Sequence, residues 1–123
     1  MKMRRIDHVV LTVTDLEQSM RFYHEVFDMP VIKEQSNDDL ITMRCGHQLI
    51  RLQKIDRPTT LKAANPTIGS ADLCLVAGDS IDDIVHHLNS YYIDIIAGPI
   101  VKQGAEGELT SLYVYDPENN LIE

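Results

Sequence analysis

Apolar residues in the first half of the chain change from a strand pattern to a helical pattern and back. Residues 6–13 are compact and rich in β-branched side chains, which predicts a strand. The apolar residues that follow recur at helical spacing and predict an amphipathic helix over 16–27, capped by Asp15 and ended by Pro30. Further extended segments are predicted at 31–32, 40–44 and 48–53, the last two joined by a turn at 45–47.

The second half of the chain repeats this order. A strand is predicted over 72–77, and Asp79 or Ser80 caps a helix with apolar positions at Ile81, Ile84, Val85 and Leu88. Three more extended segments follow: one beginning at Ile93, Ile95 and Ile96, a hairpin from Leu109 to Tyr115, and a closing strand at 121–123.

One fixed offset of 64 residues relates the two halves. It links His8 to Asp72, Asp15 to Asp79 and Val31 to Ile95. This internal repeat predicts an α+β fold in which two βαβββ modules form a cupped mixed sheet. We expect a single domain with module one at about 4–54, a linker at about 55–69 and module two at about 70–123, since 123 residues is an ordinary domain length.

Composition narrows the function classes. Hydrophobic residues make up 44% of the chain and charged residues 24%, which is ordinary for a globular protein. The net charge of −8 and the lack of a basic run disfavour nucleic acid as a partner and would suit a cationic ligand. No segment has the length of a bilayer span or the apolar run of a signal peptide, so we expect no membrane partner and a cytoplasmic protein. Cys45 and Cys74 are expected to be reduced, buried apolar residues.

Alternation along the strands places candidate metal ligands on one face. We expect Val9, Leu11 and Val13 to pack under the first helix, which leaves His8 on the open, concave face. The same alternation places Asp72 on the concave face of module two.

Gln53 and Glu123 end matching strands of the two modules. Duplication therefore predicts four ligand-type residues in pseudo-symmetric register: His8, Gln53, Asp72 and Glu123. The alternatives are a hydrogen-bonded structural His8, a solvated Asp72 at a strand entry and a surface Gln53.

Both ends of the chain carry recognisable motifs. The run DHVVLTVTDLEQSMRFYHEVFDMPVI joins a strand with a His to a helix, and GELTSLYVYDPENNLIE closes the chain. They resemble the vicinal-oxygen-chelate (VOC) superfamily of glyoxalases, bleomycin resistance proteins and extradiol dioxygenases, which has an "FY…LGM" helix end and a closing "DP(D/G)GNLIE" strand. The run GSADLCL at 69–75 is similar to the glyoxalase-domain-containing-5 and bacterial "virulence protein" type.

The resemblance implies a metal site and a chemistry. His8 matches the first ligand of the superfamily and Glu123 the last, Gln53 falls where members place Glu, His or Gln, and Asp72 falls where well-characterised members place a second His. The implied cofactor is one divalent ion, Mn, Fe, Ni, Zn or Mg. In glyoxalase-type members this ion acts as a Lewis acid while a ligand carboxylate, here Glu123, shuttles the proton.

The functional expectation is therefore a metal-dependent lyase or isomerase of glyoxalase type, acting on a small oxygenated metabolite. The alternatives are a metal-free, ligand-sequestering protein of bleomycin-resistance type and a relative of the ring-cleaving dioxygenases. Dioxygenase sites use two His and one carboxylate, and this set offers one His. By the same resemblance we expect a homodimer, with sites that either one chain or both chains build.

Three residues are candidates for substrate contact. Arg51 shares a strand face with Gln53 and could bind an anionic group, although a solvated cation at a sheet edge is the alternative. Tyr113 and Tyr115 share one face and are expected to line the pocket.

Overall fold

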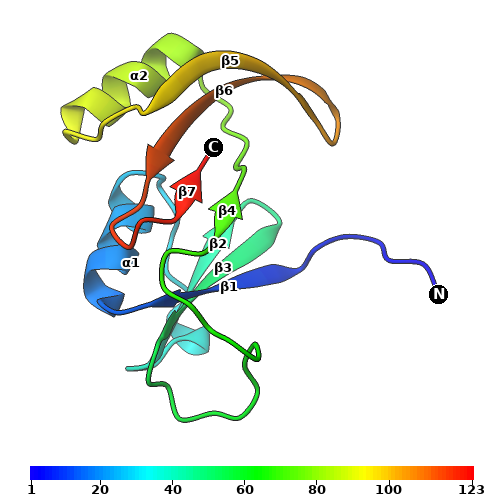
Figure 1. The fold of residues 1–123 in the computed structure, drawn as a ribbon, viewed down its shortest axis with the longest axis vertical. Helices are drawn as coiled ribbons and strands as arrows, with labels where there is room; N and C mark the ends of the chain where they lie inside the picture. Colours follow the sequence, from blue (N-terminus) through cyan, green and yellow to red (C-terminus); the bar gives the residue numbers. More distant parts are fainter.

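The first half of the chain forms a three-stranded sheet covered by one helix (Figure 1). The computed structural model describes all residues 1–123. In chain order the elements of this module one are β1 (His8–Val13), α1 (Leu16–Glu25), the short 3₁₀ helix η1 (Lys33–Gln35), β2 (Leu40–Cys45) and β3 (Gln48–Lys54). The strand order is β1-β3-β2, with β3 parallel to β1 and antiparallel to β2. An isolated bridge from Val31 to Met43 stands where a fourth strand would lie, beyond β2.

Module two repeats this arrangement with four strands. Its elements are β4 (Asp72–Leu73), α2 (Ile81–Ser90), β5 (Ala97–Gly104), β6 (Gly107–Tyr115) and β7 (Leu121–Ile122). The strand order is β4-β7-β6-β5, so in both modules the first strand lies parallel to the last. The predicted α+β fold of two βαβββ modules is confirmed. Figure 1 shows the C-terminus in the middle of the molecule, while the first residues extend away from it.

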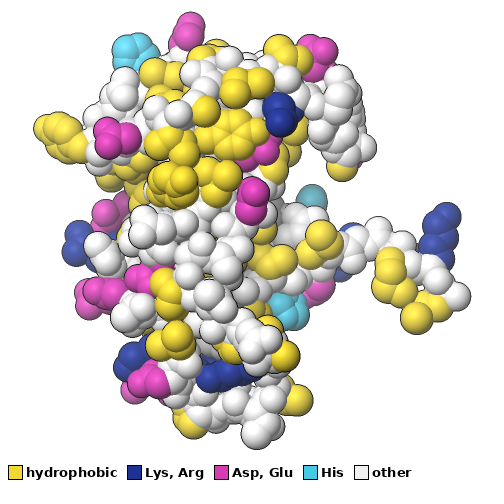
Figure 2. All heavy atoms as spheres, viewed as in Figure 1, with side chains coloured by type: hydrophobic (Ala, Val, Ile, Leu, Met, Phe, Trp, Pro, Cys, Tyr) yellow, Lys and Arg dark blue, Asp and Glu magenta, His cyan; other side chains and the backbone are white.

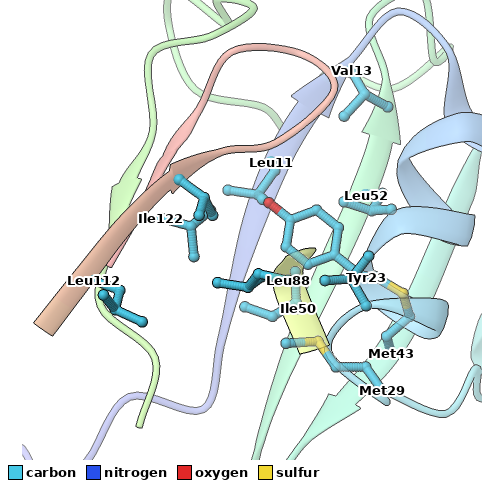
Figure 3. Packing of buried hydrophobic residues seen from close by; sticks show 12 residues of the cluster. Leu11, Val13, Tyr23, Met29, Met43, Ile50, Leu52, Leu88, Leu112 and Ile122 are labelled. Carbon is cyan, nitrogen blue, oxygen red and sulfur yellow. The ribbon is translucent and has the colours of Figure 1, made fainter. Parts of the chain in front are cut away.

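The core lies mainly between α1 and the sheet of module one. Leu11 and Val13 of β1 are buried under the helix and Val9 is half-buried, as their alternation predicted. Leu11 and Val13 belong to a cluster of twelve buried apolar residues that also contains Leu112 and Ile122 of module two, and Val9 packs against it (Figure 3). One continuous core therefore joins the two modules.

A buried polar turn fixes module two against module one. The Tyr23 hydroxyl of α1 donates a 2.6 Å hydrogen bond to Oδ2 of Asp116, which also accepts from the Asn120 side chain at 2.9 Å. Burial and the neighbouring Asp116 charge raise the pKa of Tyr23 far above its usual value. From the same turn, the Glu118 carboxylate accepts from the backbone N–H of Thr14 at 2.6 Å, just before α1 begins. The turn at 116–120 therefore connects both the start and the middle of α1 to module two.

Helix α1 is shorter than its apolar spacing predicts. It begins after the predicted cap Asp15, whose side chain accepts from the Gln18 N–H at 3.0 Å, but it ends at Glu25 rather than Phe27. Asp28 takes a left-handed conformation (φ 54°), and the N–H of Met29 reaches back to the Tyr23 carbonyl at 3.2 Å. This turn closes the helix before Pro30. In module two, Ser80 rather than Asp79 is the cap. None of the helices is long and apolar enough to cross a membrane.

Two strands of module two differ from expectation. β4 covers only Asp72–Leu73, although backbone bonding continues to the N–H of Leu75, which donates to the Glu123 carbonyl at 2.8 Å. Residues 76–77 do not belong to a strand. The strand predicted from Ile93 begins at Ala97 instead, and β5 and β6 form a longer hairpin than the 109–115 segment predicted.

The start of β5 is irregular where it passes Ser111. Its register with β6 shifts between Ala97 and Ile100. Gly98 occupies this irregularity at φ +98°, and a Cβ there would overlap the carbonyl oxygen of Ser111. A residue without a side chain is therefore required for β5 to lie close to this part of β6.

Candidate functional site

The open face of module one carries the first two predicted ligands. Strand register sets Val10 beside Arg51 and Thr12 beside Gln53, so His8, Arg51 and Gln53 share the face opposite α1. This arrangement confirms that His8 faces away from the core.

His8 is exposed, and both of its ring nitrogens have partners. Nδ1 lies 2.8 Å from Oδ1 of Asp7, and Nε2 lies 3.2 Å from Nη1 of Arg51. A guanidinium can only donate, so Nε2 must accept and Nδ1 carries the hydrogen that goes to Asp7. That hydrogen bond lowers the pKa of Asp7. His8 is thus held as the tautomer whose Nε2 lone pair accepts from Arg51, while a carboxylate orients the ring through Nδ1, as carboxylates do for metal-ligating histidines.

Gln53 is buried, with 4% of its surface exposed, which rules out the surface-glutamine alternative. Its Nε2 donates to Oγ1 of Thr12 at 3.4 Å, and its Oε1 accepts from Nη1 of Arg57 at 3.3 Å. The Gln53 amide is therefore oriented with its oxygen toward the Arg57 guanidinium group.

The corresponding face of module two carries the two carboxylates. Asp72 pairs with Leu121 of β7, which pairs in turn with Tyr115, so all three share a face with Glu123 two residues farther along. Asp72 is exposed, and Tyr115 is half exposed. The predicted tyrosines therefore lie on the same face as the predicted carboxylate ligands.

Glu123 is held in place although it is the last residue. Its N–H donates to the Leu73 carbonyl and its carbonyl accepts from the Leu75 N–H, both at 2.8 Å. Its Oε2 accepts a 2.6 Å hydrogen bond from the buried Ser111 hydroxyl. This bond is the main cause of a lowered pKa for Glu123, helped by Tyr113. The carboxylate therefore stays ionised at neutral pH and has one oxygen free of Ser111.

Cys74 departs from its prediction because it is exposed rather than buried. It lies just beyond the end of β4, on the face of Glu123. Partial burial raises the pKa of its thiol, and the nearby negative charges of Glu123 and Asp72 raise it further. The thiol is therefore protonated and acts as a neighbour of Glu123 rather than as a nucleophile.

The four predicted ligands form two pairs, one on each sheet. His8 and Gln53 lie on module one, and Asp72 and Glu123 lie on module two. Within one chain, no group of three or more His, Cys, Asp or Glu side chains is close enough to hold a metal ion.

A cavity of about 1130 Å³ lies between the modules. One wall consists of the end of α1 and the β2–β3 turn, and the other consists of α2 and β6. Ser111 and Glu123 are among the lining residues. Figure 2 shows hydrophobic side chains gathered over and beneath α2 and the β5–β6 hairpin. Sequence reasoning missed Ser111 and Arg57. Alternation along β6 could have placed Ser111 on the face of Tyr113, whereas nothing in the sequence indicates that Arg57 turns back to Gln53.

Comparisons with known proteins agree with this fold. Residues 5–123 match the model of the Glyoxalase/Bleomycin resistance protein/Dioxygenase superfamily. The chain is 40% identical to Virulence protein STM3117 of Salmonella typhimurium over 97% of its own length and 81% of that protein. The crystal structure of that protein superimposes with a TM-score of 0.92 at 39% identity, covering 99% of this chain and 95% of the other.

Two further relatives carry enzyme-type names. Glyoxalase domain-containing protein RDO1 of Mycosarcoma maydis is 37% identical over 100% of this chain and 68% of its own length. Biphenyl-2,3-diol 1,2-dioxygenase 2 of Rhodococcus globerulus is 28% identical over 94% of this chain and 59% of its own length.

Proposed function

Because the chain belongs to the Glyoxalase/Bleomycin resistance protein/Dioxygenase superfamily, we propose that it is a metal-dependent enzyme of glyoxalase type, a lyase or isomerase for a small oxygenated metabolite. The site would join the His8 face of one subunit to the Glu123 face of a second subunit in a homodimer. The observation that carries this proposal is the pair of incomplete half-sites, each oriented by hydrogen bonds and each on an open sheet face.

Exposed apolar residues support a second subunit. Val10 beside His8 is 44% exposed, and Tyr115 and Ile100 on the Glu123 face are 50% and 43% exposed. Only 19 of 123 residues are buried, so these faces are poorly covered within one chain. Apolar surface that surrounds polar groups is typical of an interface or a ligand site.

The donor set suits a divalent cation. One imidazole, one amide oxygen and two carboxylates form a mixed nitrogen and oxygen set that Mn²⁺, Fe²⁺, Ni²⁺, Zn²⁺ or Mg²⁺ can accept. The hydrogen bond to Asp7 makes Nε2 the acceptor nitrogen of His8. An ion bound by Nε2 of His8 and Oε1 of Gln53 would take the places now held by the Arg51 and Arg57 guanidinium donors. A bound ion would supply Lewis-acid polarisation of the substrate oxygens.

Glu123 would move the proton. Its carboxylate is ionised, and Ser111 holds Oε2, which leaves Oε1 to accept a proton from a carbon next to a carbonyl and to return it. Tyr113 and Tyr115 would line the same face and exclude water from the substrate.

A metal-free, ligand-sequestering protein is the second candidate. The mainly apolar cavity of about 1130 Å³ and its several acidic lining residues favour it, because a bulky cation would fit both features. Dioxygenase chemistry is disfavoured, since a site of two His and one carboxylate cannot be assembled from one His among the four positions.

Elemental analysis separates the first two candidates. We expect about one divalent ion per chain in the purified protein, lost in His8→Ala and kept in His47→Ala, whose histidine lies in the exposed β2–β3 turn. A wild-type protein that stays empty after exposure to Mn²⁺, Ni²⁺, Zn²⁺ and Fe²⁺ would exclude the enzyme and leave the sequestering protein.

A further inference from the structure

Two arginines on the open face of module one have no acidic partner. Arg51 and Arg57 are both partly buried, yet the ion pairs of the chain are Asp7–His8, Arg21–Glu25 and Lys54–Asp56. Acidic residues outnumber basic ones by 19 to 11, so carboxylates are plentiful elsewhere in the molecule. The Asp7 carboxylate acts on Arg51 through space but is bonded to His8, so the two partly buried guanidinium charges still outnumber it and leave this face locally positive.

Arg51 is fixed in position by neutral groups. Nη1 lies 3.2 Å from Nε2 of His8, and Nη2 donates to Oε1 of Gln35 at 3.0 Å. Its Nε is buried and has no hydrogen-bond partner. A buried donor without an acceptor is costly, and an anion is the acceptor that a guanidinium binds best.

Arg57 extends the same positive patch. It donates to the Gln53 side chain at 3.3 Å, and Gln53 follows Arg51 by two residues on the same strand face. Residues two apart on a strand lie about 7 Å from each other. A small molecule with two acidic groups, or one acidic group and a neighbouring carbonyl, could therefore contact both arginines.

We propose that Arg51 and Arg57 form a carboxylate-binding site on the open face of module one, so that the substrate of the proposed His8–Glu123 site is a small organic acid. This inference rests on the proposed function and extends it, because it states that the substrate of the proposed site is negatively charged. It also opposes the expectation from net charge: the whole chain is acidic at −8, but this face selects an anion. Each guanidinium fork can pair with one carboxylate through two parallel hydrogen bonds, and a molecule with two carboxylates can pair with both arginines at once, which a single phosphate group cannot do as fully.

Binding of simple anions to protein stripped of metal tests the proposal. Malonate, its neutral analogue malonamide and inorganic phosphate would each be titrated by calorimetry into chelator-treated protein after gel filtration. We expect malonate to bind, malonamide not to bind and phosphate to bind more weakly than malonate. Arg51→Met should weaken malonate binding about ten- to hundredfold, as expected for loss of a charged hydrogen-bond donor.

Matched variants decide whether the effect is local. Arg51→Lys keeps the positive charge but loses the planar guanidinium group. Its affinity for malonate should lie between those of the wild type and Arg51→Met. Arg21→Met makes the same charge change on the outer surface of α1 and should bind malonate like the wild type. Arg57→Met should weaken binding as well, and it provides the test if Arg51→Met fails to fold.

Equal binding of malonate and malonamide, or unchanged malonate binding in folded Arg51→Met and Arg57→Met, would overturn the proposal. Tighter binding of phosphate than of malonate would overturn the carboxylate assignment. Because no metal is present in this experiment, its result is independent of whether His8 and Glu123 hold an ion.

Discussion

The two modules share one strand order but differ in packing and in the chemistry of their open faces. Eight of the twelve core residues belong to module one, whereas β5 of module two is exposed along almost its whole length. The open face of module one presents His8, Arg51 and Gln53, and that of module two presents Asp72 and Glu123. The two modules therefore share a backbone frame, while their open faces carry opposite charges, positive on module one and negative on module two.

Truncations of matched leucines should reveal the difference in packing most strongly. Leu52 in module one is fully buried, whereas Leu112 of β6 lines the cavity between the modules. We expect Leu52→Ala to cost about 3 to 5 kcal/mol of unfolding free energy and Leu112→Ala about 2 kcal/mol or less, since the second site already borders empty space. Urea denaturation at one protein concentration measures both, and equal losses would show that module two is packed as tightly as module one.

Loss of the hydrogen bond between Tyr23 and Asp116, which connects the two modules, should give the next largest effect on stability. Tyr23→Phe removes the 2.6 Å hydrogen bond to the buried Asp116, and we expect a loss of about 1.5 to 3 kcal/mol. Tyr92→Phe is the matched control, because its side chain is almost fully exposed. An equal fall in unfolding free energy in both variants would argue that the Tyr23–Asp116 hydrogen bond does not stabilise the fold.

A smaller effect is expected in the acid limb of the pH–stability curve. The pKa of Glu123 is lowered in the folded protein, so its contribution to stability is present above its unfolded pKa and is lost as pH falls through its folded pKa. Ser111→Ala should raise the folded pKa of Glu123, while Ser111→Thr should restore it. The ¹³C shift of the Glu123 carboxyl carbon, followed through an acid titration, measures this pKa. An unchanged titration in Ser111→Ala would remove Ser111 from the site.

Sequence alone predicts the frame better than it predicts the site. Alternation in β1 correctly separates Leu11 and Val13 from His8, because a side-chain period of two is fixed by the backbone. It overestimates the length of β4, since the length of a strand depends on its partner, and β4 pairs with β7 only at Asp72 and Leu73.

The sequence pattern could not predict contacts between side chains that are distant in the chain or that lie outside regular elements. Ser111 reaches Glu123 from another strand, and Arg57 returns to Gln53 from the segment after β3. Such contacts depend on register and rotamer, which no local pattern specifies. The role of Asp116 in holding Tyr23 across 93 residues of chain is of the same kind.

Whether one metal site draws His8 and Glu123 from different subunits can be measured with a mixed dimer. His8→Ala and Glu123→Gln chains, co-expressed with different affinity tags, would be purified as the heterodimer and compared with both parent homodimers by elemental analysis. One of the two sites in such a heterodimer would keep both ligands, so we expect about one divalent ion per heterodimer and none in either homodimer. A heterodimer as empty as its parents would contradict a shared site.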